Sequence, residues 1–346
     1  MSEPKKRWRY GFKRWLIIGL TILGAYAAFF GPSILKPISP VVVLPGEPTG
    51  LSIGGFEITN TMLATLLADV ILILIALGAW RFHKKGNLVP SGFYNFFEII
   101  VEFLWNSVEG TAGRWARRVF PLVATIFLLI FVANMVKLVP GFESIGYLKE
   151  VHEGTGYGPV ELFTIGSLTV YTIDKGQPHD VDAEGTESAE HSEESEALCV
   201  ACEVVPYLRG SATDVNFTFG LAISAVFMVQ VYGVWAARGM GYFEKFFPVK
   251  QLVSGSPFGV INFAVGFLEI ILEFAKILSF GFRLFGNIFA GALLLSIVGA
   301  LVAIIIPPGL YLFEVFFGII QAYVFFLLAT VFISGATVSH HGSESH

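Results

Sequence analysis

The sequence predicts an all-α integral membrane protein with about five to six membrane helices and one amphipathic helix at the membrane surface. First, 54% of its 346 residues are hydrophobic and only 14% are charged, which is more apolar than a soluble domain of this size. Second, long apolar runs recur along the chain. Third, basic residues lie at the ends of these runs, as they do beside membrane helices. The aromatic residues belong to the apolar runs and not to a basic surface, so nucleic acid is not an expected partner.

The apolar runs divide the chain into membrane and connecting segments, because a bilayer span needs about 20 mostly apolar residues. Residues 1–31 combine a basic head with a short apolar run, which fits either a cleaved signal peptide or an uncleaved anchor. The remaining expected membrane helices are residues 62–80, 120–139, 213–236, 257–306 and 309–338.

The distribution of charge predicts the side on which each connecting segment lies, since Lys and Arg concentrate in cytoplasmic loops. They are frequent at the N-terminus and between the helices 62–80 and 120–139. Residues 32–61 are therefore expected outside. Residues 141–212 hold 14 of the 27 acidic residues of the chain and read as an external acidic insertion loop. The tail 339–346 is then expected to be cytoplasmic.

Residues 91–113 have the pattern of an amphipathic helix. Polar side chains recur every three or four residues between apolar ones, among them Glu98, Glu102 and Glu109. The pattern fits a helix lying at the membrane surface, and it equally fits a helix packed on other protein. It assigns no chemistry to the carboxylates.

The tract 258–306 is too long for one upright membrane helix. It holds about 49 residues without proline, which as a single helix would measure roughly 73 Å, against a bilayer core of about 30 Å. Either two ordinary spans joined by a turn or one strongly tilted helix satisfies this length.

Polar side chains within this tract share one helix face. At about 100° per residue, five of them fall within an arc of ~80°. Beyond the break at Pro307-Pro308-Gly309, two more polar residues lie on one face of the last helix, so the two stripes predict a polar seam. The seven residues are Glu269, Lys276, Ser279, Arg283, Asn287, Glu314 and Gln321.

Arg283 carries the chemical argument, because an arginine inside a membrane costs between ~2.5 and ~17 kcal/mol and must face a partner or a hydrated cavity. One reading is an ion pair with Glu269, Glu273 or Glu314 that only locks helices together. A hydrated ion path is favoured, since the stripe carries an acid, a base, a hydroxyl and an amide in series.

The run Phe282–Gly291, FRLFGNIFAG, resembles the signature of subunit a of the F-type ATP synthases. Further matching residues lie in the runs 120–139 and 213–236 and in Gln321-Ala322-Tyr323-Val324-Phe325, so the resemblance covers most of the chain from about residue 55 to 338. It implies a stator subunit of the Fo sector, with a long, highly tilted C-terminal helical hairpin facing a ring of c-subunits. Arg283 is the essential arginine of this signature.

The resemblance also implies two half-channels for protons on either side of Arg283. The external one would be lined by Asn134, Asn216, Asn287, Glu314 and Gln321, and Glu269, Lys276 and Ser279 would lie toward the cytoplasmic exit. Family members place an acid or histidine at two facing positions, which here are Ala292 and Glu314. Glu314 is thus expected to act as the single relay carboxylate.

Partners, location and cofactors follow from the same resemblance. The implied partners are the c-subunit ring, the b-subunit peripheral stalk, the other ATP synthase subunits and lipid, in a bacterial plasma (inner) membrane. The subunit would not be catalytic on its own, although it takes part in ATP synthesis by hydrogen ion transport. No cofactor and no metal are expected. H⁺ is the expected ion, and the ring would set the choice between H⁺ and Na⁺.

The acidic loop departs from the family by its length, and it contains both cysteines of the chain, Cys199 and Cys202. A CxxC in an external loop fits a small disulfide, a metal site with His179 and His191, or two free thiols. The stretch from Asp182 to Glu196 is rich in Ser, Glu and His and is expected to be solvated and partly disordered.

Two other classes of protein compete with the stator interpretation. A secondary transporter or ion channel would use the stripe of Arg283 and Glu314 as its own ion site. A structural membrane scaffold would use the buried charges only to hold helices together.

Overall fold

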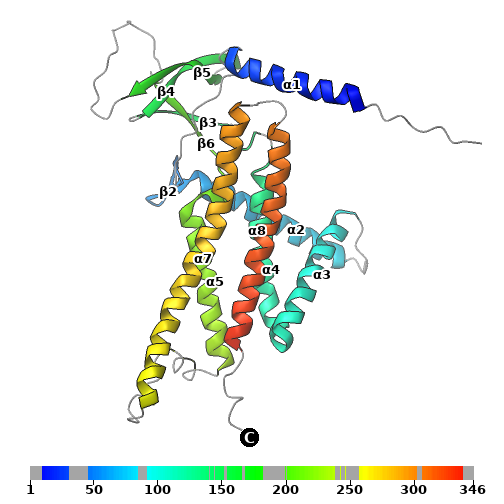
Figure 1. Ribbon diagram of the computed structural model, residues 1–346, viewed down its shortest axis with the longest axis vertical. Helices are drawn as coiled ribbons and strands as arrows, with labels where there is room; N and C mark the ends of the chain where they lie inside the picture. The colour runs from blue at the N-terminus through cyan, green and yellow to red at the C-terminus, as the bar shows by residue number, and fades with distance from the viewer. Residues whose placement is uncertain are drawn as a thin grey trace, which may run out of the picture. The chain divides into compact units, whose positions relative to one another are not determined.

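A computed structural model describes most of the chain (Figure 1). Contacts between residues divide it into two compact units: Met1–Val43, Glu143–Leu208 and Ala290–Glu314 form the first, and Leu44–Phe142, Arg209–Phe289 and Val315–His346 form the second. The described residues are 10–30, 46–84, 92–139, 141–143, 145–151, 154–165, 168–181, 199, 201–237, 242, 246, 257–301 and 306–337.

Long helices dominate the second unit, and they arise from the apolar runs of the sequence. Four segments in the described part of the chain are long and apolar enough to cross a membrane: Asn60–Lys84, Phe93–Val136, Val215–Ala236 and Pro308–Thr337. The expected all-α membrane fold is thereby confirmed. The helices are α2 (Asn60–Lys84), α3 (Phe93–Ala112), α4 (Ala116–Val136), α5 (Val215–Ala236), α7 (Pro257–Leu301) and α8 (Ile306–Thr337).

α7 is a single continuous helix of 45 residues. Of the two readings of the long apolar tract, the structure therefore adopts one helix and not two spans joined by a turn. At 1.5 Å per residue it is about 68 Å long, roughly twice the thickness of a bilayer core.

α4 and α5 run antiparallel, and aromatic and charged residues join the start of α4 to the end of α5. Tyr232 donates a hydrogen bond from its hydroxyl to the carbonyl oxygen of Arg118 over 2.8 Å. The guanidinium of Arg118 lies over the rings of Trp115 and Trp235, at 5.1 and 4.7 Å from their centroids. Tryptophan and arginine are typical of the membrane–water boundary, where a ring can be buried while a charge reaches water.

α7 and α8 also run antiparallel. The ring of Phe280 lies 4.6 Å from that of Phe325 and 5.5 Å from that of Phe332. Ala322 and Ala329 of α8 are buried nearby. Small side chains at such positions let helix backbones approach closely, which is how helices associate in lipid without a hydrophobic driving force.

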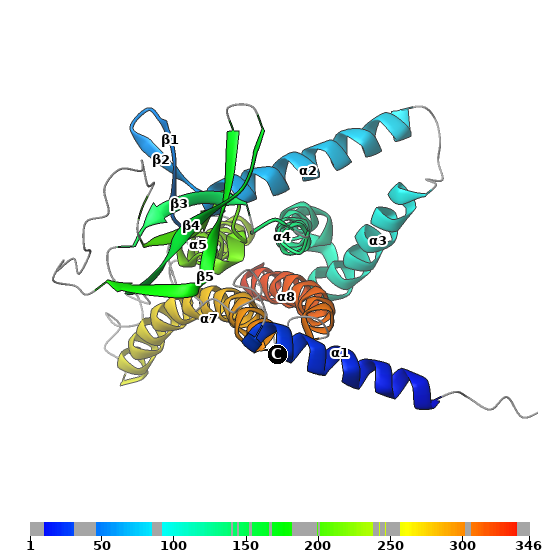
Figure 2. The ribbon, with the colours of Figure 1, turned by 90° about the horizontal axis from the view of Figure 1, so that it is seen from above.

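α2 lies across the other long helices of the second unit. Seen from above, α4, α5 and α8 are nearly end-on while α2 extends sideways (Figure 2). α2 contacts α4 through Ala68, which packs with Val132 and Ala133. One bilayer cannot hold both α2 and the bundle upright, so at least one of the two must be inclined to the membrane normal.

α3 packs on its own chain through one face. Leu104 and Val108 are fully buried, and the ring of Phe103 lies 5.3 Å from that of Tyr323 on α8. The hydroxyl of Ser334 donates to the carbonyl oxygen of Thr111 over 2.9 Å. One face of this amphipathic helix therefore packs on protein, and its position at the membrane surface stays a prediction. The polar residues of its opposite face are exposed: Asn95, Glu98, Glu102, Asn106 and Glu109.

A buried polar cluster lies at the start of α5. Asp214 is the N-cap residue, and its Oδ1 accepts from the backbone N–H of Asn216 over 2.8 Å. Its Oδ2 accepts from the hydroxyl of Thr61 on α2 over 2.7 Å. The backbone of Gly46 passes so close that an added Cβ would lie 2.4 Å from Thr61 Oγ1. One carboxylate therefore joins α5 to α2.

The first unit contains strands that the sequence did not predict. β3 (Gly146–Glu150), β4 (Gly154–Ile165), β5 (Leu168–Val181) and β6 (Cys202–Pro206) form an antiparallel sheet in the order β3-β6-β4-β5. The acidic composition of this segment predicted a loop and gave no indication of strands, whereas β4 and β5 pair from Gly154↔Val181 to Ile165↔Leu168. The stretch 182–196 lies outside the described residues, as do 1–9, 31–45, 302–305 and the tail 338–346.

α1 (Tyr10–Phe30) and a disulfide complete the first unit. The sulfur atoms of Cys199 and Cys202 are bonded, with their Cα atoms 5.7 Å apart. Of the three readings of the CxxC motif, the structure contains the small disulfide. Cys202 begins β6, so the bridge fixes the chain where it enters the sheet. The second unit has its own two-stranded hairpin, β1 (Pro48–Ile53) and β2 (Phe56–Thr59), directly before α2.

Candidate ion path

Arg283 lies on an exposed face of α7. Its Nη2 lies 3.4 Å from the hydroxyl oxygen of Ser279, one turn earlier on the same helix. Leu284, the next residue, is fully buried in the helix bundle. The bundle therefore holds the backbone of Arg283 in place while the guanidinium points away from it.

No carboxylate of the described residues in the second unit lies within 4.0 Å of the Arg283 guanidinium. Glu273, one of the candidate partners, instead pairs with Lys276 over 2.7 Å. The Nζ of Lys276 also lies 5.0 Å from the ring centroid of Phe332 on α8. The interpretation of Arg283 as half of a helix-locking pair with Glu269 or Glu273 is therefore not realised.

Asn287 and Gln321 bring the two polar stripes together. Asn287 Nδ2 donates to Gln321 Oε1 across α7 and α8 over 3.5 Å. Gln321 is only 5% exposed, and its Nε2 has no hydrogen-bond partner. A buried amide with a free donor is a place where water is expected, because an unsatisfied polar group costs about 1–3 kcal/mol.

Asn134 extends the same region to α4. It is 1% exposed and donates from Nδ2 to the backbone carbonyl of Gly318 over 3.3 Å. An added Cβ on Gly318 would lie 3.1 Å from Asn134 Cβ. The close approach of α4 and α8 at this point therefore depends on glycine. Asn134 and Gln321 are thus buried polar residues that each form a hydrogen bond between two helices.

Glu314 belongs to the first unit, together with residues 290–301 of α7. Its Oε1 lies 3.0 Å from the place where a Cβ on Gly291 would be. Gly291 directly precedes Ala292, which the resemblance to subunit a aligns with a position for an acid or histidine. The carboxylate of Glu314 is thus next to the part of α7 from which that residue is missing.

The remaining polar residues that the sequence singled out lie apart from the contacts between Asn134, Asn287, Gly318 and Gln321. Asn216 is exposed in the first turn of α5, and its backbone N–H is the group that contacts Asp214. Ser279 is exposed beside Arg283, and Glu269 is half-buried about four turns before Arg283. Asp69 is exposed on α2, and Lys137 is half-buried at the end of α4.

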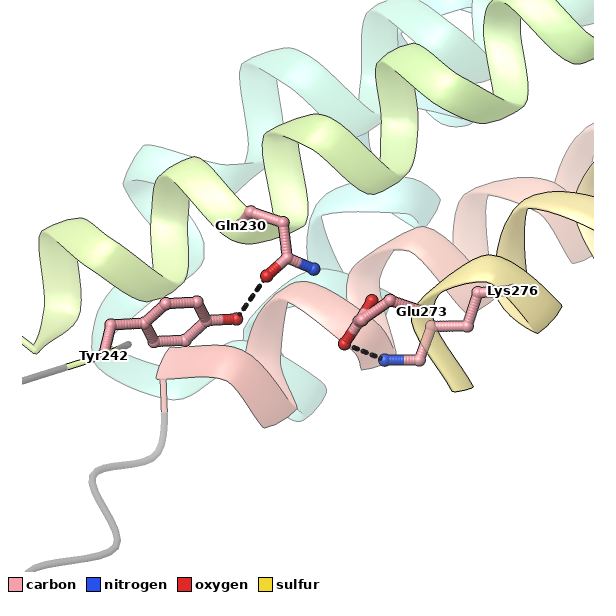
Figure 3. A network of polar contacts seen from close by, with 4 residues as sticks. All are labelled: Gln230, Tyr242, Glu273 and Lys276. Carbon is pink, nitrogen blue, oxygen red and sulfur yellow. Dashed lines mark hydrogen bonds and ion pairs between the residues drawn. The ribbon is translucent and has the colours of Figure 1, made fainter. Parts of the chain in front are cut away.

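Sequence reasoning missed two polar residues that the structure places near Glu273. Gln230 on α5 accepts a hydrogen bond from the hydroxyl of Tyr242 over 2.8 Å, beside the pair of Glu273 and Lys276 (Figure 3). Gln230 gave a signal, because it is an amide inside an otherwise apolar run. Tyr242 gave none, since it lies in a connection with no periodic pattern.

The fold and these contacts define a multi-pass membrane protein whose longest helix carries charged and amide side chains along its apolar length. The chain belongs to the ATP synthase A chain family, whose model matches residues 62–334. It is thereby a membrane component of an ATP synthase, with a role in ATP synthesis and proton transport.

Curated relatives agree with this assignment. The sodium ion specific ATP synthase subunit a of Propionigenium modestum is 27% identical over 285 residues, which cover 82% of this chain and 75% of the relative. The ATP synthase subunit a of Helicobacter pylori (strain Shi470) is 28% identical, over 80% of this chain and 89% of the relative. That of Sulfurihydrogenibium sp. (strain YO3AOP1) is 25% identical, over 78% and 95%.

Proposed function

We propose that this chain is the proton-translocating stator subunit of the Fo sector of an F-type ATP synthase. Its own role is conduction and coupling, and catalysis would belong to other subunits. The observation that carries the proposal is the exposed Arg283, which has no carboxylate among the described residues of its own unit within ion-pair distance. An arginine on an apolar helix requires a counter-charge, and a ring of c-subunits with membrane-embedded carboxylates would supply one.

The guanidinium couples ion flow to rotation by electrostatics. Arg283 stays charged at any relevant pH, so it favours the ionised form of a ring carboxylate that approaches it. That carboxylate releases its proton there. Away from Arg283 it faces lipid, where ionisation is penalised, so it must be reprotonated before it can rotate further. The same cation opposes a proton that would cross directly between the half-channels.

The two half-channels are assigned from the polar residues on either side of Arg283. Residues lining the external one are Asn134, Asn216, Asn287, Glu314 and Gln321, and Glu314 is the proposed relay carboxylate. The buried contacts Asn134 to Gly318 and Asn287 to Gln321 support this assignment. Toward the cytoplasm the path includes Glu269, Lys276 and Ser279. We take H⁺ as the transported ion.

Orientation follows from charge and from the disulfide. The concentration of Lys and Arg outside the segment 141–212 supports an external position for that segment, and we take the membrane to be a bacterial inner membrane. The bond between Cys199 and Cys202 supports this side, because disulfides persist in oxidising compartments. The C-terminus is then cytoplasmic. When α2 spans the membrane upright, its crossing of the bundle supports a strong inclination of α7 and α8 to the membrane normal.

The partner face of α7 can be tested by crosslinking. Leu272 is exposed and lies 11 residues, about three turns, before Arg283 on the same face. In the membrane-bound complex, Leu272→Cys should crosslink to a small hairpin subunit through cysteines placed beside its membrane carboxylate. Ile73→Cys, on the exposed face of α2, is the matched control and should not crosslink to that subunit.

A chain that purifies in mild detergent without such a ring, and whose Leu272→Cys variant crosslinks to no small subunit, would contradict the stator proposal. That result would favour the alternative of a transporter or channel that uses Arg283 and Glu314 as its own ion site. The b-subunit of the peripheral stalk should be recovered in the same preparation.

A further inference from the structure

A second polar cluster lies at the end of the second unit where α5 leads into α7 (Figure 3). Gln230 comes from α5, Tyr242 from the connection, and Glu273 and Lys276 from α7. The Tyr242 hydroxyl donates to Gln230 Oε1 over 2.8 Å, and Lys276 Nζ donates to Glu273 Oε1 over 2.7 Å. The cluster therefore consists of two hydrogen-bonded pairs from three segments of the chain.

Packing fixes the position of the Tyr242 hydroxyl. The residue is 7% exposed, and its ring lies directly on α5 at Gly233, where an added Cβ would come 2.3 Å from Tyr242 Cε2. Its ring also meets that of Phe246 edge to face at 5.7 Å. Any side chain at position 233 would push the tyrosine away from Gln230.

Each pair leaves one buried polar atom without a partner. In the described part of the chain there are only three such side-chain atoms: Gln230 Nε2, Glu273 Oε2 and Gln321 Nε2. The first two are a donor and an acceptor, and in Figure 3 the Gln230 amide nitrogen is turned toward the side of Glu273. Buried donors and acceptors are usually satisfied by ordered water when protein groups do not reach them. Ordered water bonded to each of these atoms would satisfy both.

Electrostatics links Tyr242 to the same carboxylates. Burial, together with the charges of Glu273 and Glu269, raises the pKa of Tyr242 to about 12. The tyrosine therefore keeps its proton at physiological pH and can both donate and accept a hydrogen bond. Among the residues that the structure describes, the charged groups near Glu273 are Lys276 and Glu269 on α7. The sequences of α5 and of residues 315–337 in α8 contain no charged residue.

We propose that Glu273, Gln230 and Tyr242 form a hydrated relay at the inner end of the ion path. This inference rests on the proposed function, since it requires that protons pass along α7. Glu273 is the proton carrier: its carboxylate accepts a proton arriving along α7 and passes it to the water at Oε2. That water then releases a proton toward the solvent. Only O–H bonds form and break, and Glu273 returns to its ionised state.

Gln230 and Tyr242 act as positioning residues in this relay. Gln230 donates from Nε2 to the water oxygen, and its own orientation is set by the bond that it accepts from Tyr242. Lys276 holds the other carboxylate oxygen of Glu273, Oε1, at 2.7 Å and so leaves Oε2 for the water. The alternative is that the two pairs have only a structural role. Proton transfer would then not depend on the two unpartnered atoms.

The relay can be tested with the whole complex in vesicles, where external ATP drives proton pumping and the cytoplasmic side faces outward. Glu273→Gln should slow pumping per assembled complex by about 100-fold, the lower range of the effect of a lost proton-transfer group. Glu273→Asp should restore part of the rate. Tyr242→Phe and Gln230→Leu should slow pumping about three- to tenfold and change its dependence on outside pH.

A second variant separates the hydroxyl from the tyrosine ring. Gly233→Ala keeps the hydroxyl but displaces the ring, so it should reproduce the altered pH profile of Tyr242→Phe. Glu109→Gln on α3 and Tyr171→Phe on β5 are exposed controls of the same chemistry and should leave the rate unchanged. Recovery of assembled complex is measured for every variant, so that a loss of folding is not counted as a loss of transfer.

Arg283→Ala in the same vesicles distinguishes the relay from the proposed function. If Arg283→Ala stops pumping while assembled Glu273→Gln pumps at the normal rate with an unchanged pH profile, the relay is wrong and the stator function stands. Variants that lower only the amount of complex, with normal pumping per complex, would likewise overturn the relay. Normal pumping by Arg283→Ala would contradict the proposed function itself.

Discussion

Asn287 and Gln321 join the two longest helices of the chain where their polar stripes meet, with Asn287 Nδ2 3.5 Å from Gln321 Oε1. The contact is long for a hydrogen bond, and Gln321 keeps a second, unpartnered donor. Such a pair contributes little to stability, but it offers donors and acceptors to water in an otherwise apolar bundle. Its expected importance is therefore in ion transfer.

Replacing either amide should slow transport more than it destabilises the protein. Asn287→Leu and Gln321→Leu are each expected to reduce ATP-driven proton pumping several-fold, and the double variant should be little slower than the singles because both interrupt one path. The loss in stability should be about 0.6 kcal/mol, as for other hydrogen bonds between membrane helices. Asn106→Leu on the exposed face of α3 is the control. Strictly additive effects on the rate would contradict a shared path.

Gly318 should tolerate no large side chain. A Cβ added at Gly318 would lie 3.1 Å from Asn134 Cβ and 3.2 Å from Met135 Cε. Gly318→Leu is expected to destabilise the complex by about 1–3 kcal/mol through overpacking. Thermal unfolding of the purified complex measures this. Gly335→Ala, also on α8 but with open space around it, should be neutral, and equal effects of the two would contradict the packing.

Asp214 should matter as a cap and as a link between helices. Asp214→Ala removes the acceptor for the N–H of Asn216 and one of the two hydrogen-bond partners of the buried Thr61 hydroxyl, whose other partner is Thr59. The expected loss is about 2 kcal/mol, again from thermal unfolding. Asp214→Asn keeps an oxygen at the cap and should lose less than half of that. If Asn and Ala were equally destabilising, the cap would not be the cause.

Tyr242 should titrate near pH 12, above the ordinary value of 10.0 for tyrosine, because burial and two carboxylates oppose its ionisation. A raised pKa in the folded state means that the folded protein holds the proton more tightly than the unfolded chain. The resulting stability is fully present below pH 10 and is lost as the pH rises toward 12. The tyrosinate absorbance of the wild type minus that of Tyr242→Phe measures the midpoint. A midpoint at 10 would contradict the buried site.

Long apolar runs predicted the membrane helices, because whether a segment can span a membrane depends on its own local sequence. The apolar run 62–80 lies within α2 and the run 213–236 contains α5, since length and hydropathy alone decide whether a segment can span lipid. Arg283 could be singled out for the same reason, because a charge in such a run is conspicuous. The continuity of α7 could not be predicted from composition, because a single helix of this length depends on its tilt and on the segments that pack beside it.

Contacts between distant segments were beyond sequence reasoning. Tyr242 reaches Gln230 from an aperiodic connection, and Thr61 reaches Asp214 across 153 residues. The strands β4 and β5 were missed because the acidic composition of their loop dominated the interpretation, although Val170, Tyr171 and their neighbours have strand propensity. Their pairing depends on a partner strand, which composition does not reveal.

The central claim is that Arg283 couples proton flow to a rotating partner, and proton pumping by the Arg283→Ala variant tests it most directly. The fully assembled variant complex in vesicles should hydrolyse ATP once uncoupled from the membrane sector, yet show no ATP-driven proton pumping. Glu102→Gln, an exposed substitution on α3, should pump like the wild type. Pumping by assembled Arg283→Ala at the wild-type rate would contradict the claim.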